Sequence, residues 1–256
     1  MENIFKKINK VIFVFSILSF LLAIIFIYNN EFLLSIGLFF VGYYFFRYSR
    51  NLIRRKNKED IRILFFDTET NGLPNNFDAP ISDTNNWPRL VQIAWLVFDA
   101  NGGLINEENH IIKPIGFKIS KSSTDIHKIT NQIANEKGVL IPEILDKFKK
   151  VVENSDLVVS HNINFDENIM GSEFIRYGLN NVLHSKRKFC TMKSSTNFCA
   201  IPGFKGYKWP KLIELYRKLF SKDFEEHNAL DDVKATADCF WELNKRKVIR
   251  LVNLFN

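Results

Sequence analysis

The pattern of apolar and polar positions divides the chain into two parts. The first part contains two nearly unbroken apolar runs, residues 11–28 and residues 32–46. At 1.5 Å per residue, a helix over the first run covers about 27 Å, which is close to the thickness of the hydrocarbon core of a bilayer. The pattern therefore predicts an α-helical transmembrane hairpin over residues 1–48, whose second helix is short unless the bilayer thins.

Basic residues flank this predicted hairpin on both sides. Of the first 60 residues, nine are Lys or Arg and four are Asp or Glu, and the turn between the two runs carries no positive charge. The positive-inside rule then places both ends in the cytoplasm. We expect residues 11–46 to lie in the lipid bilayer of an inner or plasma membrane. Residues 49–60 then form a basic juxtamembrane linker, and the domain that follows faces the cytoplasm.

A signal peptide is the alternative for the first run, because it also combines a basic start with an apolar core. The second apolar run directly behind the first, and the lack of a small-x-small cleavage site between them, argue against this alternative.

The second part, residues 61–256, has the alternating pattern of an α/β domain. Apolar, β-rich stretches at residues 61–66, 90–99 and 104–113 are separated by turn residues, which predicts an antiparallel meander. Helical patterns follow at residues 122–129 and 142–152. A short buried strand is expected at residues 157–160 and a helix from residue 228 to about 245.

Charge and cysteine content narrow the function of this domain only slightly. It contains 26 Lys or Arg and 24 Asp or Glu, so net charge gives no indication of general nucleic-acid binding. Cys190, Cys199 and Cys239 form no CxxC pair and no zinc spacing, which is typical of reduced thiols. The evidence for a function must therefore come from a specific site in this domain.

Acidic residues follow two of the expected strands. Asp67 and Glu69 come directly after residues 61–66, and at i and i+2 they point to the same side of the strand. Two carboxylates held close together repel each other unless a cation lies between them, although an exposed acidic strand end is a common alternative. Asp166 follows the strand at 157–160, in the first turn of a helix for which we expect Asn164 as the N-cap.

A further acid is expected at the start of the helix near residue 228. Asn228 is a suitable N-cap, which places His227 just outside the helix. Asp231 has Lys234 three positions on and suits an exposed ion pair. Asp232 has the small Ala229 three positions before it, which leaves room for a ligand. We therefore expect Asp232, rather than Asp231, to be the acid of the site.

Three motifs together resemble those of the DEDDh exonucleases, the DnaQ-like proofreading branch of the ribonuclease H-like superfamily. They are Asp67-Thr-Glu69, His161-Asn162-x-x-Phe165-Asp166 and His227-x-Ala229-x-x-Asp232, in the family's order. The resemblance implies an α/β fold in which helices flank a ribonuclease H-like mixed five-stranded sheet. It also implies that residues 61–256 form the exonuclease domain.

The resemblance assigns a role to each residue of these motifs. Asp67, Glu69, Asp166 and Asp232 would hold two Mg²⁺ or Mn²⁺ ions, and His227 would be the general base. The implied reaction is hydrolysis of phosphodiester bonds from the 3′ end of single-stranded DNA or RNA, with release of 5′-mononucleotides. Two hard cations beside a neutral imidazole suit this chemistry.

Other residues match the family more loosely. Thr68, Asn71, Gly72 and Leu73 resemble the strip along which the terminal nucleotide lies, with an ordinary turn as the alternative. His127 resembles a residue beside the terminal base, although Lys128 stands where the family usually has Gly. Asn162 is expected to contact substrate or a metal-bound water rather than to cap a helix.

Residues 205–211 alternate Lys with aromatic side chains. This pattern is typical of a loop that stacks bases and binds phosphates, and equally of a loop that packs Trp209 on the core.

Two other functions remain open at this point. An inactive domain of the same fold, tethered to the membrane, would bind nucleic-acid ends without cleaving them. Alternatively, the membrane hairpin would be the principal functional part, with the nuclease as an auxiliary. No base-reading motif distinguishes DNA from RNA as the substrate.

Overall fold

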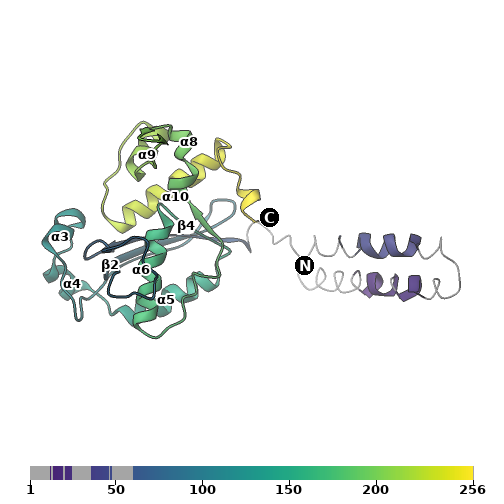
Figure 1. Cartoon of the computed structure of the whole chain (residues 1–256), viewed down its shortest axis with the longest axis horizontal. Coiled ribbons are helices and arrows are strands. Elements are labelled where there is room, and N and C mark those ends of the chain that lie inside the picture. The colour runs from purple at the N-terminus through teal and green to yellow at the C-terminus, as the bar shows by residue number, and fades with distance from the viewer. Residues whose placement is uncertain are drawn as a thin grey trace. The chain divides into compact units, whose positions relative to one another are not determined.

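The computed structural model describes residues 12, 14–19, 21–24, 36–45, 47 and 60–255 of the chain. The chain divides into two compact units, Met1–Asn57 and Lys58–Asn256 (Figure 1).

The described residues of the first unit are helical, but they do not form the predicted membrane spans. Among the described residues no helix is long and apolar enough to cross a membrane. A span needs about 20 residues of continuous helix, because the hydrocarbon core offers no hydrogen-bond partners to the backbone. The prediction of a membrane protein with its second domain facing the cytoplasm is therefore wrong. The transmembrane hairpin and its bilayer contact through residues 11–46 are likewise unsupported. The remaining residues of those two runs, like those of the linker at 49–59, lie outside the described residues.

The second unit is built on a mixed sheet of five strands. They are β1 (Arg62–Thr70), β2 (Leu90–Asp99), β3 (Leu104–Ile111), β4 (Leu157–Ser160) and β5 (Lys188–Cys190), in the order β3-β2-β1-β4-β5. The predicted meander is confirmed, because β1 pairs antiparallel with β2 and β2 with β3. β4 pairs parallel with β1, and β5 parallel with β4. The carboxyl ends of β1, β4 and β5 therefore lie at one edge of the sheet.

Helices cover both faces of this sheet (Figure 1). Alternate residues of β1 face opposite sides, so Ile63 and Phe65 pack with α9 and α10, whereas Leu64 and Phe66 pack with α5 and α6. The helices of this unit are α3 (Lys121–His127), α4 (Asn131–Lys137), α5 (Ile141–Glu153), α6 (Ile163–Arg176), α7 (Thr191–Ser194), α8 (Thr196–Cys199), α9 (Leu212–Phe220) and α10 (Ala229–Lys245). A small hairpin, β6 (Pro202–Gly203) and β7 (Gly206–Tyr207), precedes α9, and a 3-10 helix, η2 (Leu251–Leu254), follows α10.

Of the two helix N-caps predicted beside the acidic residues, one is correct and the other is wrong. Asn228 caps α10, since its side chain accepts a hydrogen bond from the Leu230 N–H. By contrast, α6 starts at Ile163, so Asn164 lies inside the helix and Asn162 occupies the cap position with a φ of 80°. Only two residues connect β4 to α6, and an Asn in the left-handed region allows the abrupt change of direction.

Candidate active site

Three carboxylates from two elements converge at the carboxyl edge of the sheet. Asp67 and Glu69 lie within β1, which continues past them to Thr70, and Asp232 lies in the first turn of α10. One oxygen atom of each lies within 4.8 Å of those of the other two. Asp231 is outside this cluster. The expected partner of Asp231, Lys234, instead forms an ion pair with Glu107 at 2.9 Å.

Asp166, in the first turn of α6, is not one of the three acids within 4.8 Å of one another, but its charge raises the pKa of Asp67 and Glu69. Both oxygens of its carboxylate accept hydrogen bonds. Its Oδ1 accepts from the Thr68 N–H at 3.1 Å and from the Thr68 hydroxyl at 2.7 Å. Its Oδ2 accepts from the Ser160 hydroxyl. Thr68, which sequence comparison placed on the substrate strip, is thus buried and orients Asp166. Asp67 and Glu69 point to the α10 face, and Thr68 between them points toward α6.

Burial raises the pKa of all four acids, and the charges of neighbouring carboxylates raise those of Asp67, Glu69 and Asp232 further. The pKa of Glu69 rises to about 8 through burial and then through the charges of Asp232 and Asp166. The pKa of Asp67 lies well above its usual range, first through burial and then through the charges of Asp166, Asp232 and Glu69. Burial also raises the pKa of Asp232 to about 7 and that of Asp166 to about 6.

Four oxygen-bearing side chains whose charges repel one another, with no basic group among them, are the donor set that a hard divalent cation prefers. The residues present therefore fit the divalent metals expected from the sequence.

His227 lies at the margin of this acidic cluster. Its side chain is exposed and its backbone has a φ of 72°. Its backbone N–H donates to Oδ2 of Asp232 at 3.0 Å, which ties the residue that carries the imidazole to one of the acids.

Sequence reasoning missed Gln92, a buried residue of β2 opposite Glu69. Its Oε1 accepts from the Ala229 N–H at 3.3 Å and its Nε2 donates to Asn109 Oδ1 at 2.9 Å. It thereby holds the start of α10, which carries Asp232. The indication in the sequence is a polar residue within the otherwise apolar run Leu90–Phe98, since such a residue needs buried partners.

The expected substrate strip lies beside a polar hollow of about 460 Å³ lined by Asn71, Gly72, Leu73 and neighbouring loop residues. The side chain of Asn71 connects two loops, because it accepts from the Arg89 N–H at 2.7 Å and donates to the Lys118 carbonyl at 3.2 Å. Gly72 has open space where a Cβ would stand, and the Leu73 side chain is exposed. Gly72 and Leu73 are thus accessible to a ligand, whereas the side-chain amide of Asn71 already makes hydrogen bonds within the protein.

Three polar residues differ in how many hydrogen bonds their side chains make: His127, Asn162 and His161. His127 is buried, its Nδ1 accepts from the Ile129 N–H, and its Nε2 has no partner in the described part of the chain. Asn162 makes no cap hydrogen bond with its side chain. His161 contacts Thr191 Oγ1 through Nδ1 and the Pro210 carbonyl through Nε2, and burial lowers its pKa to about 4. The neutral His161 is therefore a structural link.

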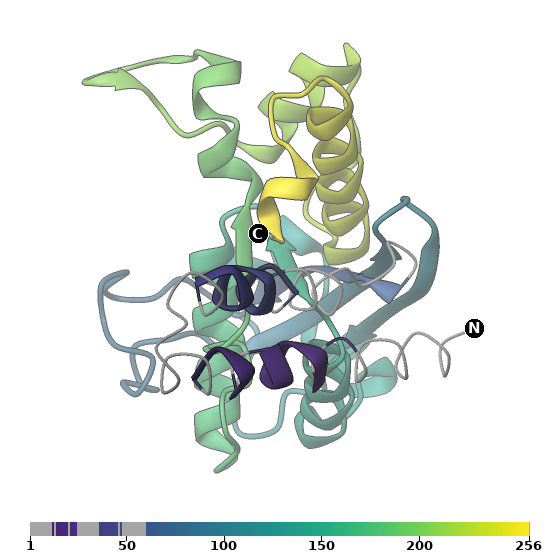
Figure 2. The same cartoon turned by 90° about the vertical axis from the view of Figure 1, so that its right-hand side faces the viewer.

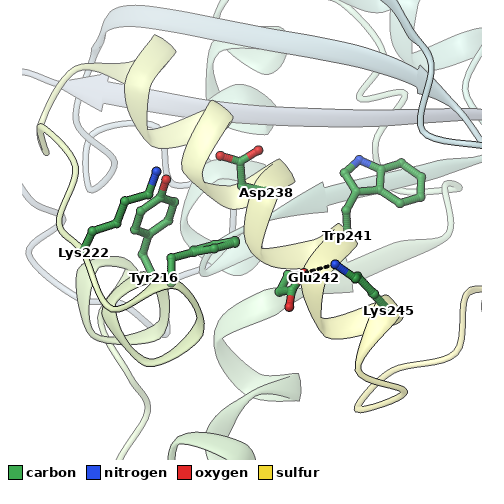
Figure 3. A pocket seen from close by; sticks show the side chains of 7 residues that line it. Tyr216, Lys222, Asp238, Trp241, Glu242 and Lys245 are labelled. Atoms are coloured by element: carbon green, nitrogen blue, oxygen red, sulfur yellow. Dashed lines mark ion pairs between the residues drawn. The ribbon is translucent and has the colours of Figure 1, made fainter.

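A second hollow, of about 310 Å³, lies between α9 and α10 (Figure 3). Tyr216, Lys222, Asp238, Trp241 and Lys245 are among the residues that line it. None of the acids described above contributes to it, and its mixture of charges includes an ion pair between Lys245 and Glu242. It is therefore separate from the acidic cluster.

Known proteins resemble this unit in sequence and in fold. DNA polymerase III PolC-type of Thermotoga petrophila is 27% identical over 191 residues, which cover 75% of this chain and 12% of that protein. The Ureaplasma parvum protein of the same name is 26% identical over 208 residues, covering 80% of this chain and 12% of that protein. The chain thus spans about an eighth of the length of these relatives.

Solved structures of exonuclease I share the fold. That of Escherichia coli with a dA16 oligonucleotide has a TM-score of 0.59 at 19% identity, covering 76% of this chain and 42% of that chain. Exonuclease I of Methylocaldum szegediense gives a TM-score of 0.58 at 19% identity, covering 77% and 42%. The sequence profile of the RNase T family, described as Exonuclease, matches residues 64–240. Because this match covers more than half of the chain, the protein belongs to the RNase T exonuclease family.

Proposed function

We propose that this protein is a 3′–5′ exonuclease that hydrolyses single-stranded nucleic acid from its 3′ end and releases 5′-mononucleotides. The observation that supports this most strongly is the convergence of Asp67, Glu69 and Asp232 within 4.8 Å at the edge of an exonuclease-family sheet. The oligonucleotide bound to E. coli exonuclease I supports a single strand as the substrate.

In this proposal the four acids hold two divalent cations, Mg²⁺ or Mn²⁺. When bound, such ions neutralise the charge on the scissile phosphate and assist both the attacking water and the departing 3′ oxygen. The chain's own contribution is to fix the acids. Thr68 and Ser160 orient Asp166, and Gln92 holds the start of α10 and with it Asp232.

His227 is proposed as the general base, which takes the proton of the attacking water. An imidazole accepts a proton near neutral pH, and its exposed position lets it reach a water at the margin of the cluster. The terminal nucleotide would lie along Gly72 and Leu73, with the unpartnered Nε2 of His127 and the side chain of Asn162 as further contacts.

The test is stepwise digestion by the full chain of a single strand labelled at its 5′ end. We expect a ladder of shortening labelled products with Mg²⁺ or Mn²⁺ and none with excess chelator. Immediate release of a labelled mononucleotide would show the opposite direction. Undiminished cleavage in chelator would overturn the metal-dependent mechanism. Parallel reactions with RNA, single-stranded DNA and duplex DNA of one sequence would identify the preferred substrate.

Two neighbouring aspartates provide a matched pair of variants for this test. Asp232→Asn should lower the rate by at least about a hundredfold, because one carboxylate leaves the cluster. Asp231→Asn, one residue away and outside the cluster, should retain most activity. Equal rates for the two variants would contradict the assignment. Tight binding of strand ends without any product would instead favour the inactive end-binding module.

A further inference from the structure

The hairpin between α8 and α9 presents aromatic side chains to solvent. β6 and β7 are joined by the two-residue turn Phe204-Lys205, and Gly206 has a φ of 93°, which only glycine adopts easily. Figure 2 shows the hairpin, in light green, projecting from the body of the domain. Phe204 is 100% exposed, Tyr207 54% and Trp209 60%, so Trp209 does not pack on the core. We call residues 202–211 the aromatic hairpin.

The surroundings of the aromatic hairpin are positively charged. Residues 191–213 contain four Lys and no Asp or Glu. Lys208 pairs with Glu214 at 2.6 Å, and Lys193 lies over the Trp209 ring at 5.6 Å from its centroid. Lys205 and Lys211 are exposed, and neither has an ion-pair partner among the residues that the structure describes. The hairpin therefore carries net positive charge beside three accessible aromatic rings.

The base of the aromatic hairpin is fixed to the end of the sheet that carries the acids. His161, which directly follows β4, donates from Nε2 to the Pro210 carbonyl at 3.0 Å and contacts Thr191, which directly follows β5, at 2.9 Å. β4 and β5 run parallel to β1, so their carboxyl ends share an edge with Asp67 and Glu69. The aromatic hairpin is therefore anchored at the same edge of the sheet as the acids.

We infer that the aromatic hairpin is a binding arm for single-stranded nucleic acid, which stacks bases on the 5′ side of the scissile phosphate and holds their phosphates with Lys205 and Lys211. The inference rests on the proposed exonuclease function. Every base offers a face to an aromatic ring and every nucleotide offers a phosphate to a lysine, so such an arm favours single strands without reading their sequence. A duplex, whose bases are already stacked, does not present these faces.

The first experiment compares a dinucleotide with a 20-nucleotide strand as substrates of the full chain. A dinucleotide has a single base on the 5′ side of its scissile phosphate, whereas the long strand offers a run of bases to the arm. The triple variant Phe204→Ser, Tyr207→Ser, Trp209→Ser should raise KM for the long strand at least about tenfold, since loss of stacking on one ring weakens binding by a factor of this order. Its KM for the dinucleotide should stay within about twofold of wild type. Equal effects on both substrates, or none on the long strand, would overturn the inference.

Tyr177→Ser is the matched control, because Tyr177 is also an exposed aromatic residue but follows the far end of α6. It should leave both KM values unchanged, and melting temperatures establish that each variant folds. Anisotropy of a labelled 20-nucleotide strand in chelator tests the arm even if wild type cleaves nothing. Inactivity of wild type would thus refute the proposed function without deciding the inference.

A second measurement uses the charges of the arm. Lys205→Gln with Lys211→Gln should reduce the slope of log affinity against log salt by about 1.4, since each phosphate contact to a single strand contributes about 0.7. An unchanged slope would exclude these lysines as phosphate ligands.

Discussion

Replacement of one acid of the cluster should stabilise the metal-free protein while it disables the proposed metal site. Glu69→Gln keeps the size and polarity of the side chain but removes a charge that Asp232 and Asp166 repel. Like charges brought together in a partly buried place oppose folding unless a cation neutralises them. The wild-type cluster therefore costs stability, and the variant recovers part of it.

The magnitude follows from the pKa of this group. Glu69 rises from its ordinary value of 4.5 to about 8, which corresponds to about 5 kcal/mol of destabilisation once the group is fully ionised. Partial access to water reduces this to about 2 kcal/mol. For a domain of this size, 2 kcal/mol corresponds to about 4–8 °C in melting temperature.

The sign of the pH dependence is fixed by the raised pKa. A carboxyl whose pKa is higher in the folded state stabilises the fold below pH 4.5, and this stability is lost as pH rises through about 8. In chelator, the melting temperature of wild type should thus fall between pH 6 and pH 9, and that of Glu69→Gln should fall less. Thermal unfolding monitored by circular dichroism across this range, with and without Mn²⁺, tests the expectation.

Addition of Mn²⁺ should reverse the order of the two proteins. An ion that binds only the folded state stabilises it according to its affinity, and the wild-type site has one more charge to hold it. Glu225→Gln, an exposed acid outside the cluster, is the control and should behave as wild type. A melting temperature of Glu69→Gln at or below that of wild type, in chelator at pH 8, would refute the proposed repulsion at Glu69.

Three further predictions concern the groups around the acids. Gln92→Leu leaves the Ala229 N–H without its partner and should lower the free energy of unfolding by about 1–3 kcal/mol, measured by urea denaturation. Thr68→Val removes the hydroxyl that orients Asp166 and should weaken Mn²⁺ binding about tenfold or more by calorimetry, whereas an unchanged affinity would argue against this role. In wild type, Mn²⁺ affinity should decrease as pH falls from 8 to 6, because Glu69 and Asp232, with pKa values of about 8 and 7, must lose protons to bind it. An affinity constant across this range would contradict the raised pKa values.

The strands that surround the acids could be predicted well from sequence, because their patterns are long or strongly apolar. β2 was predicted over the same residues that the structure shows, Leu90–Asp99, and β4 over Leu157–Ser160. β5 has only three residues, and Ala134 is the only buried residue that α4 has, so neither shows an apolar period in the sequence. These elements are defined by their contacts with the rest of the domain.

The predicted membrane hairpin is not supported, because no helix among the described residues is long and apolar enough to cross a membrane. The predicted start of α6 was wrong for a reason that the structure shows. Asn162 and Asn164 are equally suitable caps by residue type, and the choice depends on how abruptly the chain leaves β4. The deciding factor at α6 is the path of the backbone, which residue type alone does not encode.

The acidic residues of the candidate site could be predicted because strand geometry alone brings them together, whereas the residues that hold them could not. Alternation along β1 places Asp67 and Glu69 on one face and Thr68 on the other. The two acids therefore lie on the face that α10 covers, and Thr68 hydrogen-bonds Asp166 of α6. The supports come from elsewhere: Ser160 at the end of β4 and Gln92 on the neighbouring strand. A carboxylate in a motif is conspicuous, but a Ser or Gln acquires its role only through the partner that the fold brings within hydrogen-bond distance. The exact positions of the acids therefore depend on the residues that hydrogen-bond to them or to their helices. Variants of Gln92 and Thr68 test that dependence more directly than variants of the acids themselves.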